Sequence, residues 1–344
     1  MKIQCNNKKH LLECALGKVP ADLCIKNARV INVFTGEILL GNVFICDGFI
    51  SHVEYENRFD VDALEIYDAG GKYLAPGFID AHIHIESSML TPAEFARAVI
   101  PWGTTTVVTD PHEIANVWGT EGVRYMHDSS EGLPMRQLID IPSCVPSVPS
   151  VESSGAEFLA DDIRQLAQLE RVQGLGEVMD FLAAANGEDR MLDILQAAED
   201  EGLYLQGHAP YLSGRMLSAY TAAGPMSCHE SRTAKEAIDK MRAGMYVDMR
   251  QSSISKDIVE CWRGVKAFRF WDTLCLCTDD REVHEILENG HMNDVIKTAV
   301  ECGMDPVLAI KSATINPARE MGIQHLGAIA PGYADDLVIL PDLV

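Results

Sequence analysis

Two kinds of apolar run alternate with polar segments along the chain, and they predict two different structures. Between residues 22 and 68 the runs are "LCIKNARVINV", "NVFICDGFISHVE" and "ALEIYDAG". They carry β-branched and aromatic residues and turn at "TGE" and "CDG", a pattern typical of short strands. We therefore expect a small β-structure ahead of the main domain.

From residue 74 onward, apolar strand-like runs are each followed by a helical pattern. The eight runs are "YLAPGFIDAHIH", "TTTVVTDPH", "RQLIDIPSCV", "RVQGLGEVMD", "LYLQGHAP", "GPMSCHES", "GMYVDMRQSS" and "TLCLCTDD". Amphipathic stretches such as "TPAEFARAVIPWG" and "RMLDILQAAEDEG" lie between them. Eight strands alternating with helices predict an α/β fold with a (β/α)8 TIM barrel, although the pattern leaves an open parallel sheet as an alternative.

Local signals place some helix ends. Thr91, Pro92 and Glu94 suit a capping box with proline in the first turn. Gly103, Gly202 and Gly244 are typical of the residue that follows a helix.

The closing residues "GAIAPGYADDLVIL" predict a turn and a strand that returns to the N-terminal β-structure. The predicted organisation is an N-terminal segment with a small β-sandwich-like domain (1–73), the barrel (74–322) and the return strand (323–344). The small domain would thus combine N-terminal and C-terminal segments.

Composition narrows the class of protein. The 344 residues are 47% hydrophobic and carry a net charge of −23, which argues against a nucleic-acid partner but not against a free nucleobase. We find no apolar run long enough for a membrane span and no apolar centre of a signal peptide in the first residues. The ten cysteines include no C-x-x-C pair, so we predict a cytoplasmic protein with free thiols. Cys275 and Cys277 could form a metal site, but packing on one face of a strand is the favoured interpretation.

Ionisable side chains gather at the ends of the barrel runs, where barrel enzymes place their active sites. In chain order they are His82, His84, Asp110, His112, Glu177, His208, His229 and Asp279. His82 and His84 face the same side because a strand repeats every two residues.

Imidazole and carboxylate groups together bind divalent transition metals. A single histidine at a strand end is more often a hydrogen-bonded core residue, but six groups at matching barrel positions, four histidines and two carboxylates, predict a metal centre. The donors exceed what one catalytic ion needs, so we expect two ions that hold a hydroxide nucleophile between them. Glu177 is the predicted bridge, and Asp279 is predicted to bind one ion and accept a proton from the attacking water.

The remaining polar groups have weaker assignments. Asp110 and His112 either orient substrate or ligands or pair with each other. Glu86 is a ligand, a partner of a ligand or a group that shapes its loop. The H-x-E of cytidine-type zinc deaminases occurs at residues 84–86, but the P-C-x-x-C that completes their site occurs nowhere in the chain.

With these residues in view, the chain resembles the amidohydrolase superfamily and, within it, the adenine deaminase family. The resemblance covers about residues 22–344 and rests on "APGFIDAHIHIESSMLTPAEFARAVIPWGTTTVVTDPHEIANVWG", "SCVPS", "GLGEVMD", "GHAPYLSG", "CHES", "MRQSS", "TDDREVHEILENGHMNDVI" and "ATINPARE". It implies hydrolysis of adenine to hypoxanthine and ammonia by attack at C6. It also implies two divalent metal ions, usually manganese or iron.

Carried onto this sequence, the resemblance assigns metal ligation to His82, His84, Glu177, His208, His229 and Asp279. Many relatives bridge their metals with a carbamylated lysine at strand four, where this chain has "LGEVMD" and no lysine nearby. That difference favours the carboxylate-bridged adenine deaminase type. Ser87, His112 and Glu113 are candidates for contacts with the purine edge.

Family members usually continue well beyond the point at which this chain ends, so the resemblance implies that a further C-terminal region is absent. Two alternatives therefore stay open: another amidohydrolase acting on a cyclic amide or an N-acetyl sugar, or an inactive truncated homologue. The predicted partner is the small molecule adenine, with no nucleic acid or membrane, and a homodimer is compatible with the prediction.

Overall fold

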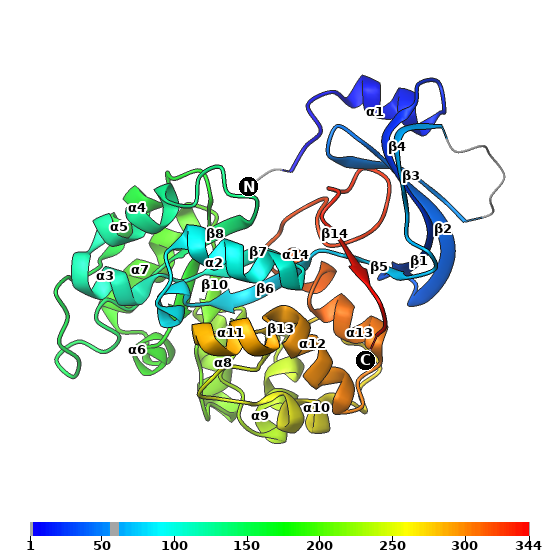
Figure 1. The fold of residues 1–344 in the computed structure, drawn as a ribbon. Coiled ribbons are helices and arrows are strands. Elements are labelled where there is room, and N and C mark those ends of the chain that lie inside the picture. The colour runs from blue at the N-terminus through cyan, green and yellow to red at the C-terminus, as the bar shows by residue number, and fades with distance from the viewer. Residues whose placement is uncertain (1–2, 56–61, 344) are drawn as a thin grey trace. The chain divides into compact units, whose positions relative to one another are not determined.

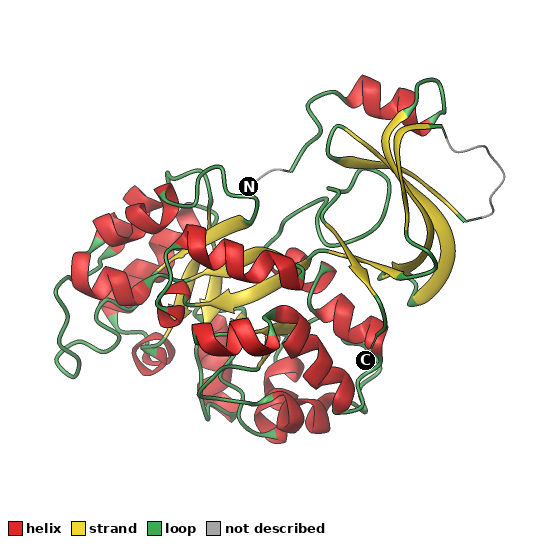
Figure 2. Ribbon diagram, in the orientation of Figure 1, coloured by secondary structure: helices red, strands yellow, loops and turns green. Residues whose placement is uncertain are grey.

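A computed structural model describes residues 3–55 and 62–343, and within them the predicted strands of the main domain are present (Figures 1 and 2). The eight strands run parallel, and helices lie between and around them. In chain order they are β6 (Phe78–Ile83), β7 (Thr104–Thr109), β8 (Arg136–Ile141), β9 (Val172–Val178), β10 (Tyr204–Gly207), β11 (Ser227–Cys228), β12 (Tyr246–Arg250) and β13 (Leu274–Cys277).

The strands pair in the order expected of a barrel. β6 to β10 form one sheet of consecutive neighbours, and β11 to β13 form a second. The amide of Met226 donates to the carbonyl of Leu205 across the gap between β10 and β11. β6 and β13 meet through a parallel bridge between Ile83 and Asp279. The result is an α/β fold of the (β/α)8 barrel type, and the strand ends converge on one mouth.

Short helices connect the strands. They are η1 (Ile85–Ser88), α2 (Pro92–Val99), η2 (Ile100–Trp102), α3 (His112–Trp118), α4 (Thr120–Asp128), α5 (Ala160–Leu166), α6 (Phe181–Asn186), α7 (Asp189–Asp200), α8 (Gly214–Ala222), α9 (Ala234–Arg242), α10 (Ile258–Val265), α11 (Val283–Asn289) and α12 (Met292–Glu301).

The predicted helix signals agree with the structure in part. α2 begins after Thr91 with Pro92 in its first turn, but the Thr91 side chain makes no capping hydrogen bond, so the predicted capping box is wrong. The glycines predicted to follow helices, Gly103, Gly202 and Gly244, all have positive φ, which confirms that prediction.

By its internal contacts the chain divides into two compact units. Of the described residues, one unit comprises 79–304, and the other comprises 3–55, 62–78 and 305–343. The boundaries predicted at residues 73 and 322 stay a prediction. The first predicted run, "YLAPGFIDAHIH", contains two strands rather than one, because β5 (Tyr73–Pro76) ends before β6 begins.

The second unit is built on a mixed sheet in the order β14–β5–β1–β2–β3, with β4 also paired to β1. Its elements are α1 (Lys8–Ala15), β1 (Ala21–Asn32), β2 (Glu37–Cys46), β3 (Phe49–Glu54), β4 (Ala63–Asp68), β5, α13 (Pro306–Ser312), α14 (Ile315–Glu320) and β14 (Leu337–Leu340). β14, from the end of the chain, pairs antiparallel with β5. Within the described ranges, no helix has the length and apolarity needed to cross a membrane.

Candidate metal centre at the barrel mouth

Six of the predicted residues come together at the carboxyl ends of the barrel strands. We call them the barrel cluster: His82, His84, Glu177, His208, His229 and Asp279. Their potential ligand atoms form overlapping groups in which all atoms lie within 4.8 Å of one another: His82/His84/Glu177, His82/His229/Asp279 and Glu177/His208/His229. The spacing of polar residues along the runs therefore becomes proximity in space.

His82 and His84 are almost fully buried, and their hydrogen bonds fix how each ring is protonated. The amide nitrogen of Gln206 donates to the carbonyl of Ala81 at 2.9 Å, which leaves the Gln206 oxygen to accept from His82 Nδ1 at 2.7 Å. His84 Nδ1 donates to the carbonyl of Asp110 at 2.8 Å. Each ring consequently directs Nε2 toward the other.

The two Nε2 atoms lie 3.1 Å apart, and Asp279 Oδ1 lies 3.2 Å from that of His84. Two nitrogen lone pairs and a carboxylate cannot share this space without a positive charge. A proton can supply one such charge, but a metal ion satisfies all three donors at once. The donor set therefore fits a divalent transition metal.

Glu177 lies between two groups of histidines at the end of β9. Its Oε2 faces His208 Nδ1 and lies 3.0 Å from His229 Nε2. Its Oε1 lies 3.5 Å from both His84 Nε2 and His112 Nδ1. Burial raises the pKa of Glu177, but the paired histidines, His208 first, outweigh it and hold that pKa well below its usual range. Glu177 is therefore a carboxylate with one oxygen toward each side of the cluster.

A glycine makes the position of Glu177 possible. The Glu177 amide donates to Asp110 Oδ2 at 3.0 Å, which draws the Asp110 carboxylate against β9. A Cβ at Gly176 would lie 2.2 Å from that oxygen, so no larger residue fits there. The motif "GLGEV" thus supplies the buried Glu177 carboxylate together with a glycine that leaves space for Asp110.

Asp279 follows β13 and has the left-handed backbone conformation, with φ of 61°. This conformation is uncommon for residues other than glycine, and the exceptions occur often at functional sites. Its Oδ2 accepts from Arg250 Nη1 at 2.7 Å, which leaves Oδ1 toward His82 and His84. Burial raises the pKa of Asp279, but His84 and the other nearby histidines have the larger, opposite effect. The pKa of Asp279 is therefore below its usual range, and the group is ionised.

Sequence reasoning missed Arg250 and Gln206. Arg250 ends β12 and also pairs with Glu230 and, at 2.9 Å, with Asp257. Its signal was available, since "MRQSS" belongs to one of the two barrel runs to which no site residue was assigned. Gln206 gave no such signal, because a polar residue inside a strand does not reveal its partner.

The weaker candidates lie along one side of the barrel cluster. Asp110 supports Glu177, and its Oδ1 lies 3.8 Å from His112 Nδ1. His112 and Glu113 begin α3 and line the same cavity as the barrel cluster. Ser87, in η1, donates to Asp280 and, at 3.3 Å, to Glu113. Glu86 accepts from the Ile114 amide at 3.4 Å, so it contacts the start of α3.

The cavity at the mouth has a volume of about 230 Å³. Besides members of the barrel cluster it is lined by His112, Glu113, Met179, Glu230, Arg232, Arg250, Ile254, Ser255 and Asp280. It is smaller than the roughly 300–1,000 Å³ of drug-sized ligand sites, which suits a small polar substrate.

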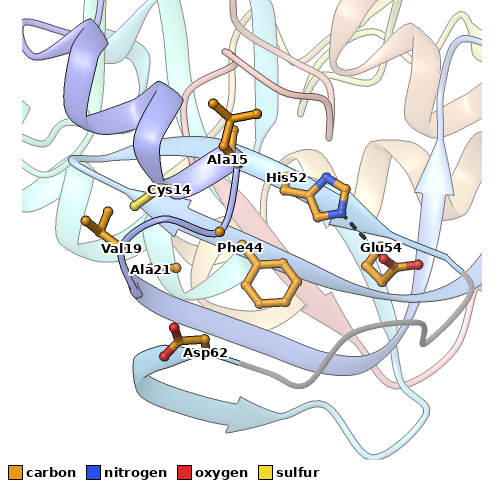
Figure 3. Close-up of a pocket in the computed structure, with 10 residues that line it drawn as sticks. Cys14, Ala15, Val19, Ala21, Phe44, His52, Glu54 and Asp62 are labelled. Carbon is orange, nitrogen blue, oxygen red and sulfur yellow. Dashed lines mark ion pairs between the residues drawn. The ribbon is translucent and has the colours of Figure 1, made fainter.

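A larger cavity, of about 400 Å³, lies in the second unit (Figure 3). Its lining includes Phe44, Cys14 and an ion pair between His52 and Glu54 at 3.6 Å. It holds no counterpart of the six converging donors among the residues that line it, so the smaller cavity is the candidate active site.

The amino-acid sequence is similar to those of a known protein family and of named proteins. The pattern of the Amidohydrolase family matches residues 73–344. The chain is 45% identical over 337 residues to "Adenine deaminase 2" of Carboxydothermus hydrogenoformans, covering 97% of this chain and 57% of that protein. It is 44% identical over 330 residues to the adenine deaminase of Listeria monocytogenes serovar 1/2a, covering 95% and 55%. The chain thus spans little more than half the length of these curated relatives.

Solved structures show the same fold at lower identity. A β-aspartyl dipeptidase from Fervidobacterium islandicum AW-1 superposes with a TM-score of 0.65 at 19% identity, covering 93% of this chain and 91% of that chain. A molinate hydrolase gives a TM-score of 0.63 at 19% identity, covering 94% and 90%.

Proposed function

The chain belongs to the amidohydrolase family, and from that premise we propose that it is a metal-dependent adenine deaminase. The observation that carries the proposal is the convergence of four histidines and two carboxylates on one small cavity at the barrel mouth. The substrate is proposed from the relatives named adenine deaminase, which are 45% and 44% identical to this chain over the aligned residues.

We propose that His82, His84, Glu177, His208, His229 and Asp279 hold two divalent ions. When bound, such ions lower the pKa of water and supply a nucleophile near neutral pH. Glu177 can serve both ions, because Oε1 and Oε2 face different histidines. Manganese is the proposed metal and iron the second choice, since imidazole-rich sets prefer transition metals over magnesium.

Asp279 is the proposed proton carrier. Arg250 holds Oδ2, so Oδ1, which faces His82 and His84, is the oxygen proposed to accept a proton from the attacking water. It would pass that proton toward the purine ring or the departing amine while the C6–N bond breaks and the C6–O bond forms. His112, Glu113 and Ser87 remain the proposed contacts with the purine edge, with Glu86 and Asp110 supporting them.

We propose that the enzyme acts in purine salvage or adenine catabolism in the cytoplasm, as a protein without a nucleic-acid or membrane partner. The net charge of −23 supports the absence of a nucleic-acid partner. A homodimer is compatible with the proposal. We also propose a small β-sandwich-like domain built from the two chain ends, which the pairing of β14 with β5 supports.

The test is ammonia release from adenine by the manganese-loaded protein, followed also by the loss of adenine absorbance. Adenosine, cyclic amides and N-acetyl sugars serve as comparison substrates. We expect turnover of adenine and poor turnover of adenosine. Equal specificity constants for adenine and adenosine would sink the free-base assignment. A preference for an amide or N-acetyl sugar would identify a different amidohydrolase activity, and no turnover of a metal-loaded chain would indicate an inactive homologue.

A further inference from the structure

A second group of potential metal ligands lies in the unit that contains α1 and the mixed sheet. His10 and Cys14 are on α1, four residues apart, so their side chains share one face of the helix. Cys46 is the last residue of β2, and Asp47 begins the turn to β3. We call these four residues the thiol cluster.

The donor atoms of His10, Cys14 and Cys46 converge, and Asp47 joins them through its contact with His10. Cys14 Sγ and Cys46 Sγ lie 2.7 Å apart. His10 Nδ1 lies 3.3 Å from Cys46 Sγ and 2.8 Å from Asp47 Oδ2. His10, Cys14 and Cys46 meet the same 4.8 Å proximity that unites the groups of the barrel cluster. A single ring nitrogen therefore faces both a sulfur and a carboxylate oxygen.

Local backbone structure holds these groups in place. Asp47 and Gly48 both have positive φ, 52° and 76°, as in the type I′ turn that Asp-Gly favours in hairpins. The Asp47 amide donates to Asp22 Oδ2 at 2.8 Å, which fixes the turn. On the helix, the His10 amide donates to the side chain of Asn7 at 3.3 Å. The cluster is thus supported from both sides.

The burial of the four residues suits an ion that enters from solvent. Cys46 is fully buried and Cys14 nearly so, whereas the side chains of His10 and Asp47 are 33% and 38% exposed. Cys14 also lines the cavity of about 400 Å³ (Figure 3). The sulfurs lie inside and the nitrogen and oxygen lie at the surface, so the site has an entry path.

We propose that His10, Cys14, Cys46 and Asp47 form a tetrahedral Zn²⁺ site, separate from the barrel cluster and independent of the proposed deaminase activity. Two thiolates, an imidazole and a carboxylate are ligands that zinc accepts. Binding releases the two thiol protons to solvent and leaves two thiolates on the ion.

The dimensions allow this with a small adjustment. Bonds of about 2.0–2.3 Å in a tetrahedral site put ligand atoms about 3.3–3.8 Å apart. The spacing of His10 Nδ1 and Cys46 Sγ, 3.3 Å, lies at the lower end of that range. The sulfurs are closer together than that, so an ion moves them apart by about 1 Å.

An ion at this position would anchor α1. The helix has eight residues, and helices shorter than about 12–15 residues are marginal without tertiary support. Zinc would join two residues of α1 to the end of β2 and the following turn. We therefore assign the site a structural role, in which zinc fastens the helix to the hairpin.

The test uses cobalt as a spectroscopic probe on the full chain. The protein is reduced, freed of metal by a chelator and titrated with Co²⁺ without oxygen. We expect a thiolate-to-cobalt charge-transfer band that Zn²⁺ then bleaches. Because the barrel cluster contains no thiolate, cobalt bound there does not produce this band. Absence of the band in the unmodified chain overturns the proposal.

Variants locate the site. The pair Cys14→Ala/Cys46→Ala should lose the band and one zinc per chain, while the control pair Cys24→Ala/Cys302→Ala keeps both. His10→Ala should weaken cobalt binding, and His52→Ala, a histidine of the same unit, should not. A band that persists in the first pair refutes the assignment. A Cys14–Cys46 disulfide in zinc-free protein, found by mass spectrometry before reduction, would identify the thiols as a redox pair instead.

Discussion

The barrel cluster and the thiol cluster both bring metal-ligand types together, but they assemble in different ways. Members of the barrel cluster lie up to 197 residues apart, from His82 to Asp279, and come from the ends of five different strands. Members of the thiol cluster lie within residues 10–47, on one helix and one hairpin. Barrel topology makes the first cluster, and local i, i+4 spacing with a turn makes the second.

The donor sets differ as well. The barrel cluster offers only nitrogen and oxygen, whereas the thiol cluster adds two sulfurs. Thiolate favours zinc and other softer ions, while nitrogen and oxygen donors also suit manganese or iron. The two clusters should therefore respond differently to the same metals, and the following experiments, ordered from the largest effect to the smallest, test that difference.

Removal of metal from the barrel cluster should abolish turnover altogether. Without a cation the close lone pairs of His82 and His84 leave no site that activates water. Dialysis against a chelator, followed by titration with Mn²⁺ or Mg²⁺, should restore activity with manganese better than with magnesium. Full activity of the apo-protein with magnesium alone would contradict the proposed ligand set.

Glu177→Ala should remove both turnover and metal. Its two oxygens face different histidines, so the variant loses a donor to each ion and leaves His208 and His229 without their carboxylate partner. Metal content and turnover are measured together, with Glu121→Ala as the control, because Glu121 is 65% exposed on α4. A variant that keeps two ions per chain and normal turnover would show that Glu177 is an ordinary strand residue.

Asp279→Asn should separate chemistry from metal binding. The amide retains the shape of the carboxylate but cannot take up the proton from water, so turnover should fall by roughly 10²–10⁴ while much of the metal remains. Asp161→Asn is the matched control, since its side chain is 98% exposed on α5. If the Asp279 variant loses its metal in proportion to its activity, ligation rather than proton transfer is the main role of Asp279.

The sequence predicted those parts of the site that follow from periodicity and topology. A strand alternates every two residues and a barrel gathers its strand ends, so His82, His84, Glu177, His208, His229 and Asp279 could be placed together before their distances were known. The resemblance to a known family pointed to the same residues.

The remaining features depend on contacts that no spacing reveals. Gln206 orients His82 from a strand that is 124 residues away in sequence. Arg250 occupies a strand end, as its barrel run could have indicated, but its contact with Asp279 across the strand pair β12–β13 was not predictable. Cys14 and Cys46 meet because the end of β2 packs against the short helix α1. No C-x-x-C pattern in the sequence indicates this contact. Side-chain partners, unlike strand ends, have to be seen in three dimensions.

Gln206→Leu should lower the metal affinity of the barrel cluster and the turnover, but by less than the substitutions of Glu177 and Asp279. The substitution removes the oxygen that fixes the ring of His82 but leaves every proposed ligand in place. Losses of about 10–100-fold in metal affinity or activity are typical when such a supporting partner is removed. Metal affinity is measured by titration of the apo-protein, and Gln206→Glu, which keeps an acceptor, should recover part of the loss. Equal loss in both variants would indicate a packing defect instead.

His127→Ala should have the smallest effect, and it tests whether any histidine of the barrel unit matters or only those at its mouth. The His127 side chain, on α4, is 12% exposed, and its Nε2 is buried without a hydrogen-bond partner among the described residues. Alanine removes that unsatisfied nitrogen, which is favourable, and also removes the contact of Nδ1 with Asp128 at 2.7 Å, which is not.

These effects of His127→Ala oppose each other, and the His127 carbonyl that accepts from Arg171 and Ser130 is kept. The free energy of unfolding should therefore change by about 1 kcal/mol or less. Turnover and metal content should stay at the values of the unmodified chain, measured beside the Glu177 variant. A large loss of turnover in a stably folded His127 variant would mean that the functional site extends beyond the strand ends, and that position at the barrel mouth is not what makes a histidine functional in this protein.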